Sequence, residues 1–194
     1  MLTLAAIAPQ IRRVNSLIPQ RRFETISGRS DKLAIEVIRR FLGADWIAEH
    51  ITSGKGFLRD DKSTAAIETL RMRRIVLGEM LYNFESAKGF RNCWMELRAG
   101  QIESAYASME IGRMLITKAI DPALTFEFVT PSSVKRHDYD LAITLGDGTP
   151  ICAETKCKME DTKITIRTLE SSFSAAKQQL PEDVPGIIFA KEST

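Results

Sequence analysis

Residues 139–158 read YDLAITLGDGTPICAETKCK, two apolar stretches around a Gly-Asp-Gly turn. Asp140 lies in the first stretch, and Glu154 and Lys156 lie in the second. Two short β-rich runs joined by such a turn predict an antiparallel hairpin. Because side chains alternate along a strand, Glu154 and Lys156 share one face, and Asp140 can lie on the same side of the sheet. The stretch therefore predicts a sheet with three charged side chains gathered on one face.

The sequence on either side of this hairpin changes from helical to β-rich after residue 123. Apolar residues at helical spacing predict helices in residues 30–51, 62–87 and 103–120, the first with Ser30 or Asp31 as N-cap and Gly43 as a stop or kink. Later β-rich runs are LTFEFVT, DYDLAITL, PICAETKCK and PGIIFAK, with the helical segment TLESSFSAAKQQL before the last. The order α, β, β, β, α, β predicts an N-terminal helical region, residues 1–98, followed by an α+β core, residues 99–194.

The charge of the chain is unevenly divided between its halves. Residues 1–100 hold 17 Lys/Arg and 11 Asp/Glu, whereas residues 101–194 hold 10 and 14, although the net charge is only +2. A basic half beside a weakly acidic half suits a protein that binds an anionic polymer. The three cysteines have no zinc-ligand spacing, and no apolar run is long enough to span a bilayer. We therefore expect reduced thiols in a cytoplasmic protein that does not enter a membrane.

The charges on the hairpin have the chemistry of a metal site. Asp140 and Glu154 repel each other if brought together, unless a cation lies between them. Hard oxygen ligands with open positions suit Mg²⁺ or Mn²⁺. Lys156, on the same face, is placed to orient or activate a water molecule beside such an ion. The hairpin is thus a candidate catalytic site.

The acidic residues and the lysine of the hairpin resemble the signature of a known family. Asp140, with Glu154-Thr155-Lys156 fourteen residues later on the next strand, is similar to the D…(D/E)xK signature of the PD-(D/E)xK nuclease superfamily. The resemblance covers about half of the chain, departs from the signature where Tyr139 replaces its proline, and includes the αβββαβ order. Many members carry a glutamate on the helix before the strands, and Glu110 in SMEIGRML occupies that place. The resemblance implies a restriction-endonuclease-like α/β sandwich with a mixed sheet.

The resemblance also implies an activity and a ligand set. Members hydrolyse phosphodiester bonds of DNA with one or two Mg²⁺ ions, in restriction, repair and antiphage defence. Asp140 and Glu154 would bind the metal with the Thr155 carbonyl, and Glu110 would complete the site directly or through water. Lys156 would position the attacking water and offset charge on the phosphorane. DNA is the implied partner, with RNA as the alternative, and a homodimer or a partner protein is a further expectation. Because the sequence stops just after GIIFAKEST, we expect the last elements of such a core to be missing or to be supplied by a partner.

Other interpretations fit the same residues. An ExK triplet arises by chance about once in a chain of this length, so an exposed hairpin with a merely charged outer face is one alternative. A second is an inactive domain of the same fold that binds DNA or another protein. A third is an adaptor that uses its arginine-rich helices to bind a protein partner.

Further polar residues are secondary candidates. Lys158 shares the face of Lys156, where a phosphate contact and plain exposure fit equally well. The other candidates for phosphate or site contacts are Gln178 with Gln179, and Arg71 and Arg74 with Arg73, Arg39 and Arg40. Glu79 and Glu103 are weaker alternatives to Glu110 as the upstream acid, and Asp138 fits a cap of the turn. His50 and His137 lack the spacing of a metal-ligand pair.

Overall fold

The computed structural model describes residues 26–52, 57–58, 64–118, 123–130, 136–158 and 165–192. The chain divides into two compact units, residues 1–86 and residues 87–194, whereas the sequence placed a boundary between residues 98 and 99. The difference is helix α5 (Phe90–Arg98), which packs against α6 (Ile102–Lys118) within the second unit. The second unit thus contains one more helix than the sequence predicted.

The first unit is helical, as expected. Its described elements are α2 (Ile26–Leu42), α3 (Ala44–Ile47), the π-helical turn η1 (Ala48–Thr52) and α4 (Thr64–Phe84). Helices α2 and α4 pack against each other where Ala34 meets Gly78, and a Cβ added to Gly78 would lie 3.0 Å from the Ala34 Cβ. Gly43, with φ of 97°, lies between α2 and α3, which confirms it as a stop. The predicted N-cap is wrong, because α2 already begins at Ile26.

Two arginines considered for phosphate binding are buried in the first unit. Arg74 is 2% exposed, and its Nε and Nη2 atoms donate to the two carboxylate oxygens of Asp31 at 2.7 and 2.8 Å. The Arg73 guanidinium lies 4.3 Å from the centroid of the Phe57 ring and donates to the Phe57 carbonyl at 3.0 Å. A guanidinium held inside a unit by a carboxylate is not available to a polyanion. This burial contradicts the phosphate contact that we expected for Arg74.

The remaining arginines of this group lie nearer the surface. Arg71 pairs with Glu68 across one turn of α4 at 2.7 Å, and its side chain is 32% exposed. Arg39 pairs with the buried Glu36 on α2, and Arg40 is exposed. A phosphate contact by Arg71 stays a prediction.

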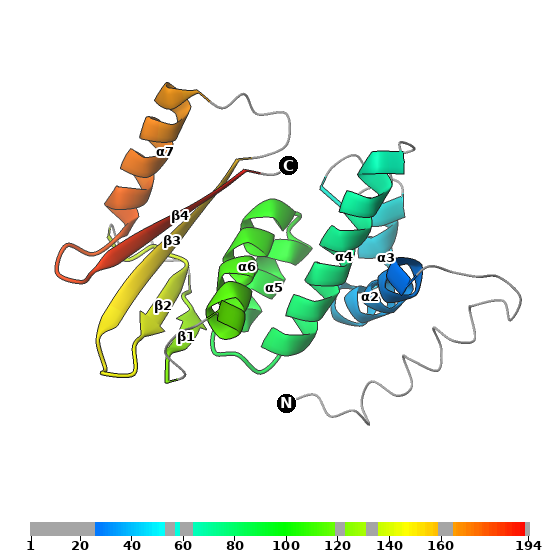
Figure 1. Ribbon diagram of the computed structural model, residues 1–194, viewed down its shortest axis with the longest axis horizontal. Helices are drawn as coiled ribbons and strands as arrows, with labels where there is room; N and C mark the ends of the chain where they lie inside the picture. The colour runs from blue at the N-terminus through cyan, green and yellow to red at the C-terminus, as the bar shows by residue number, and fades with distance from the viewer. Residues whose placement is uncertain are drawn as a thin grey trace, which may run out of the picture. The chain divides into compact units, whose positions relative to one another are not determined.

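The second unit is built on a four-stranded mixed sheet. Its elements after α6 are β1 (Thr125–Phe128), β2 (Leu141–Thr144), β3 (Pro150–Lys158), α7 (Ile166–Gln179) and β4 (Gly186–Glu192). The strand order is β1-β2-β3-β4, with the first two pairs antiparallel and the β3–β4 pair parallel. A parallel pair needs a crossover, and α7 supplies it. These elements confirm the α+β class and the predicted order α, β, β, β, α, β (Figure 1).

The predicted hairpin is present as β2 and β3. Leu141 pairs with Ala153 and Thr144 pairs with Pro150, in antiparallel register. The turn closes where the Leu145 N–H donates to the Thr149 carbonyl at 3.0 Å. Asp147 accepts the Thr149 N–H at 2.9 Å, so this carboxylate stabilises the turn.

Helices α6 and α7 cover opposite faces of the sheet. Ser108 of α6 contacts Thr155 of β3, and Gln179 of α7 contacts Lys156, the next residue along the strand. Adjacent strand residues point to opposite faces, and Figure 1 shows the two helices on either side of the sheet. Gly112 lets α6 approach closely, because an added Cβ would lie 2.9 Å from the Phe126 ring.

Gly89 fixes the start of α5 against strand β1. Its φ is 75°, and an added Cβ would lie 1.7 Å from the Phe128 carbonyl oxygen. We expect Gly89→Ala to lower the free energy of unfolding by about 2–4 kcal/mol, because strand β1 must shift and the backbone conformation is strained. Gly148 is a matched control with φ of 86° and no neighbouring atom within 4 Å, so Gly148→Ala should cost only about 1 kcal/mol. Urea unfolding followed by circular dichroism compares the two variants, and equal losses would contradict this account.

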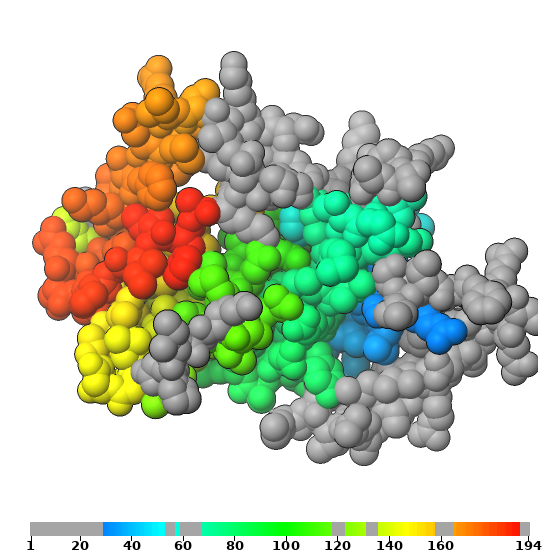
Figure 2. Space-filling model, in the orientation of Figure 1, coloured from blue at the N-terminus to red at the C-terminus, as the bar shows by residue number. Residues whose placement is uncertain are grey.

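Strand β4 forms one edge of the described sheet. Its Ile187 side chain is 40% exposed, and the strand is visible in red beside the orange α7 in Figure 2. Cys93, Cys152 and Cys157 form no disulfide. None of the helices in the described ranges is both long and apolar enough to cross a bilayer.

Candidate functional site

Asp140 lies immediately before β2, where the regular pairing with β3 ends. Its N–H donates to the Ala153 carbonyl at 3.0 Å. Its carboxylate oxygen Oδ2 accepts the Thr155 N–H at 2.6 Å and also accepts the Thr155 hydroxyl. The side chain therefore replaces a bond of the strand ladder, which fixes the carboxylate at the β3 backbone. Two donors on one oxygen favour the ionised carboxylate.

Thr155 links Asp140 to helix α6. The Thr155 Oγ1 atom lies 3.0 Å from the Ser108 Oγ atom, and both residues are buried. Because the single Thr155 hydroxyl proton is donated to Asp140, the Ser108 hydroxyl is the donor to Thr155, and it can alternatively donate to the Ser104 carbonyl at 3.2 Å. The chain of hydroxyls thus anchors the Asp140 carboxylate to the helix that covers this face of the sheet.

Glu154 and Lys156 meet on the opposite face of β3, as strand alternation predicted. The Lys156 Nζ atom donates to Glu154 Oε1 at 2.5 Å. The Glu154 side chain is only 3% exposed, whereas that of Lys156 is 26% exposed. The other carboxylate oxygen of Glu154, Oε2, is buried and finds no hydrogen-bond partner among the described residues. A buried polar atom without a partner is costly and often marks a functional site.

Gln179 of α7 holds the lysine from the other side. Its Oε1 atom accepts from Lys156 Nζ at 2.5 Å, and its Nε2 atom donates to the Asp138 carbonyl at 2.8 Å. One side chain therefore joins the lysine to the segment that carries Asp140. Gln178, which we named for the nucleic-acid contact, is exposed on α7. The structure assigns the contact with the site to Gln179 instead.

The carboxylates of the site resist ionisation. Burial and, to a smaller extent, the charge of Asp140 raise the pKa of Glu154 to about 7, against the partly opposing effect of Lys156. Burial also raises the pKa of Asp140, against the two hydrogen bonds from Thr155 and the charge of Lys156. The charge of Asp140 acts on Glu154. The Asp140 carboxylate, however, is held by Thr155, whose side chain meets α6, so the three charged side chains do not gather on one face of the sheet as we expected. A cation between them would relieve this repulsion.

The raised pKa of Glu154 predicts a dependence of stability on pH. Between its ordinary value of 4.5 and about 7, the folded protein holds a proton on Glu154 that the unfolded chain has lost. Raising the pH through this window therefore lowers the free energy of unfolding. We expect wild type to lose up to about 3 kcal/mol relative to Glu154→Gln between pH 5 and pH 8 in EDTA. Urea unfolding at both pH values measures the difference, and parallel curves for the two proteins would contradict the prediction.

Glu96 of α5 is an acid near the site that the sequence did not suggest. Burial and, to a smaller extent, the charge of Asp140 raise its pKa to about 6. Cys93, one turn earlier, has its pKa raised by burial, by Glu96 and by Asp140, so its thiol is un-ionised and unreactive. Residues Phe90, Cys93 and Leu97 are buried at helical spacing after Gly89, and this pattern was the available signal for α5.

The structure does not place Glu110 at the site. Glu110 is two residues beyond Ser108 on α6, which puts it about 200° further round the helix, while Ser108 faces Thr155. The charges of Lys156 and Asp138 shift the pKa of both Asp140 and Glu154, and the charge of Asp140 also shifts that of Glu154; Glu110 is not among these charges. The expected ligand role of Glu110 therefore has no support from the geometry.

The other secondary candidates lie elsewhere or outside the described part. Glu79 is on α4, in the first unit, and Glu103 is in the first turn of α6. His137 is exposed, and His50 lies beside Trp46 and Glu49 in the first unit. Lys158 ends β3, but its side chain is outside the described residues.

The donor set fits a divalent cation in part. Across the described ranges, no group of three or more His, Cys, Asp or Glu side chains is placed to hold a metal ion. Asp140, Glu154 and the carbonyl of Thr155 remain as donors, and Mg²⁺ is commonly held by one or two carboxylates with water and substrate phosphate as its other ligands. The buried Glu154 Oε2 atom without a partner is the observation that fits such an ion.

Comparisons with protein-family models, with curated proteins and with solved structures gave no match for this chain.

Proposed function

We propose that this protein is a metal-dependent nuclease that hydrolyses phosphodiester bonds of DNA, built on a restriction-endonuclease-like core in the second unit. The observation that carries the proposal is the arrangement at β3. A buried glutamate has an oxygen without a partner, shares its other oxygen with Lys156 and lies close enough to Asp140 to feel its charge. A merely solvated strand face would leave these charges in water, with ordinary pKa values.

Each residue of the site has a distinct task in this proposal. Asp140 and Glu154, with the Thr155 carbonyl, would hold Mg²⁺ or Mn²⁺, which supplies Lewis-acid stabilisation of the phosphate when bound. Thr155, itself bonded to Ser108, holds the Asp140 carboxylate in place, and its hydrogen bonds partly oppose the rise in the pKa of Asp140 that burial causes. Lys156 orients the attacking water and places a positive charge beside the phosphate as negative charge builds there. Gln179 holds the ammonium group of Lys156 in position.

Incubation of the purified chain with supercoiled plasmid tests the proposal. We expect nicked or linear product with Mg²⁺ or Mn²⁺ and none with EDTA. Absence of product under all three conditions, on plasmid and on single-stranded DNA and RNA, would overturn the proposal. Salt-dependent DNA binding without cleavage would instead support an inactive domain of this fold that serves as a binding module.

A further inference from the structure

Helix α5 presents a basic and apolar outer face, formed by Arg91, Trp94, Met95 and Arg98. These residues recur every three or four positions, which places them on one side of the helix. The adjoining side of the helix, with Phe90, Cys93 and Leu97, is buried, and Trp94 lies half-buried at the border between the two sides. The short helix is therefore amphipathic, but its outward side carries large aromatic and thioether groups as well as positive charge.

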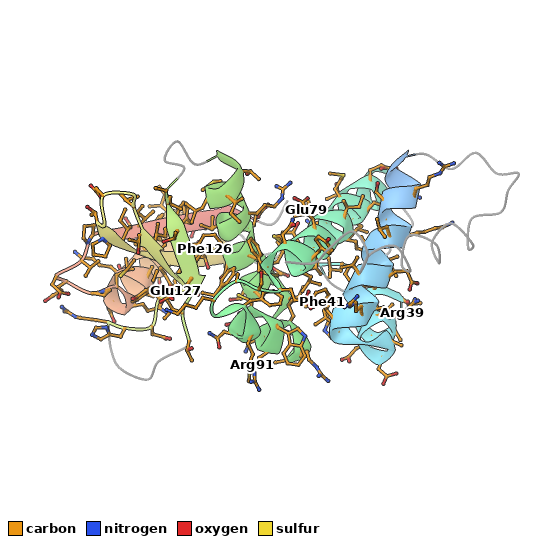
Figure 3. All side chains as sticks on the ribbon, turned by 90° about the horizontal axis from the view of Figure 1, so that it is seen from below. Arg39, Phe41, Glu79, Arg91, Phe126 and Glu127 are labelled. Atoms are coloured by element: carbon orange, nitrogen blue, oxygen red, sulfur yellow. The ribbon has the colours of Figure 1, made fainter. Side chains whose placement is uncertain are left out.

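The exposure and charge of this α5 face suit an anionic ligand with flat apolar parts. Arg91 and Arg98 are exposed, and Met95 is 54% exposed. Figure 3 shows Arg91 projecting away from the ribbon. The Arg98 guanidinium lies 5.0 Å from the centroid of the Trp94 ring, which holds a charge beside an aromatic surface. The remaining charged residue of α5, Glu96, is half-buried on another side of the helix.

Hydrogen bonds fix the position of α5 relative to the candidate site. The Asn92 side chain donates to the Thr130 hydroxyl at 3.1 Å. The preceding residue, Val129, donates its N–H to the Asp140 carbonyl at 2.9 Å. Residues 129–130 are therefore hydrogen-bonded both to α5 and to Asp140. A ligand on the α5 face would be held at a constant distance from the carboxylates.

We propose that the α5 face binds an unpaired stretch of nucleic acid and leads it to the candidate site. Arg91 and Arg98 bind phosphates, while Trp94 and Met95 contact the face of a base. In a duplex the base faces are hidden by stacking, whereas an unpaired strand offers them to aromatic and apolar side chains. The inference rests on the proposed nuclease function and deepens it, since it assigns the substrate class as single-stranded DNA or RNA, or the single-stranded part of a branched substrate.

Binding in EDTA tests this surface without any cleavage. Fluorescence anisotropy with a labelled oligothymidylate should show tighter binding than with a duplex of the same length. The double variant Arg91→Gln/Arg98→Gln should weaken binding at least about tenfold, and the slope of log affinity against log salt should fall by about 1.4, for two lost contacts. Trp94→Leu should weaken binding by about tenfold or more. Circular dichroism verifies that each variant is folded.

Arg29→Gln is the matched control, because Arg29 is an exposed arginine on α2 in the first unit, and it should bind as wild type does. Unchanged affinity of the α5 variants for the oligothymidylate, or an equal loss of affinity in the control, would overturn the assignment of the α5 face as a binding surface. Preference for the duplex would overturn the assignment to unpaired strands. Binding through α5 with no cleavage under any metal would overturn the nuclease and leave the surface standing. If wild type and the α5 variants cleave at equal rates and bind with equal affinities, the nuclease stands and the assignment of the α5 face as a binding surface is overturned.

Discussion

Lys156→Ala is expected to abolish phosphodiester cleavage while the chain stays folded and still binds DNA. Lys156 donates hydrogen bonds to both Glu154 and Gln179, so its removal takes away the positive charge and the donor at the point where water would attack. Loss of such a group costs about 10²–10⁴-fold in rate. Initial rates of plasmid nicking under Mg²⁺, with anisotropy for DNA binding, measure the two effects separately.

Two substitutions in α7 serve as comparisons for Lys156→Ala. Gln179→Ala removes the hydrogen bond that holds the Lys156 ammonium group but keeps the lysine. We therefore expect a partial loss of cleavage rate, about tenfold, with unchanged DNA binding. Lys177→Ala removes an exposed lysine of the same helix and should cut as wild type does. If Lys156→Ala cleaves as fast as wild type, the assignment of Lys156 fails.

Arg74→Ala is expected to cause the largest loss of stability in the first unit, about 3–5 kcal/mol. The substitution leaves the buried Asp31 carboxylate without the guanidinium that donates to both of its oxygens. Arg71→Ala is the matched control from the same helix, because its pair with Glu68 is at the surface and should be worth less than about 1 kcal/mol. Urea unfolding followed by Trp46 fluorescence, in a Trp94→Phe background, reports on the first unit alone.

The double variant Asp31→Leu/Arg74→Met separates burial from pairing. It removes both charges and keeps apolar volume, so it should recover most of the stability that Arg74→Ala loses. If Arg74→Ala and Arg71→Ala cost the same, the buried pair does not have the structural role that we assign to it.

The hairpin and the site on it could be predicted because strand periodicity is a strict rule. Alternation alone placed Glu154 and Lys156 on one face, and the turn sequence fixed the antiparallel pairing. Alternation could not predict the direction of the Asp140 side chain or its hydrogen-bond partner. The regular ladder ends at Leu141, so the carboxylate is free to accept the Thr155 N–H. Hydrogen bonds at the end of a strand depend on local departures from regular backbone geometry, and the alternation of residues in the sequence does not predict these departures.

The errors share a different cause, which is tertiary contact. Arg74 was expected at a phosphate and Asp31 at a helix start, yet they bind each other across 43 residues of sequence. Glu110 was chosen by its place before the strands, but it lies about 200° round α6 from Ser108, and Ser108 is the residue that meets the sheet. Gln178 and Gln179 are neighbours in sequence, and only packing of α7 on β3 decides which one reaches Lys156.

Binding of Mn²⁺ tests the central claim most directly, because it needs neither a substrate nor cleavage. Isothermal titration at pH 7.5 should detect binding to wild type. Binding should weaken at least about tenfold in Asp140→Asn/Glu154→Gln, since both carboxylate ligands are lost. The control Asp147→Asn removes an exposed carboxylate of the hairpin turn, and this variant should bind Mn²⁺ as wild type does. Equal Mn²⁺ affinity for wild type and for the Asp140→Asn/Glu154→Gln variant would contradict the assignment of these two acids as a metal site.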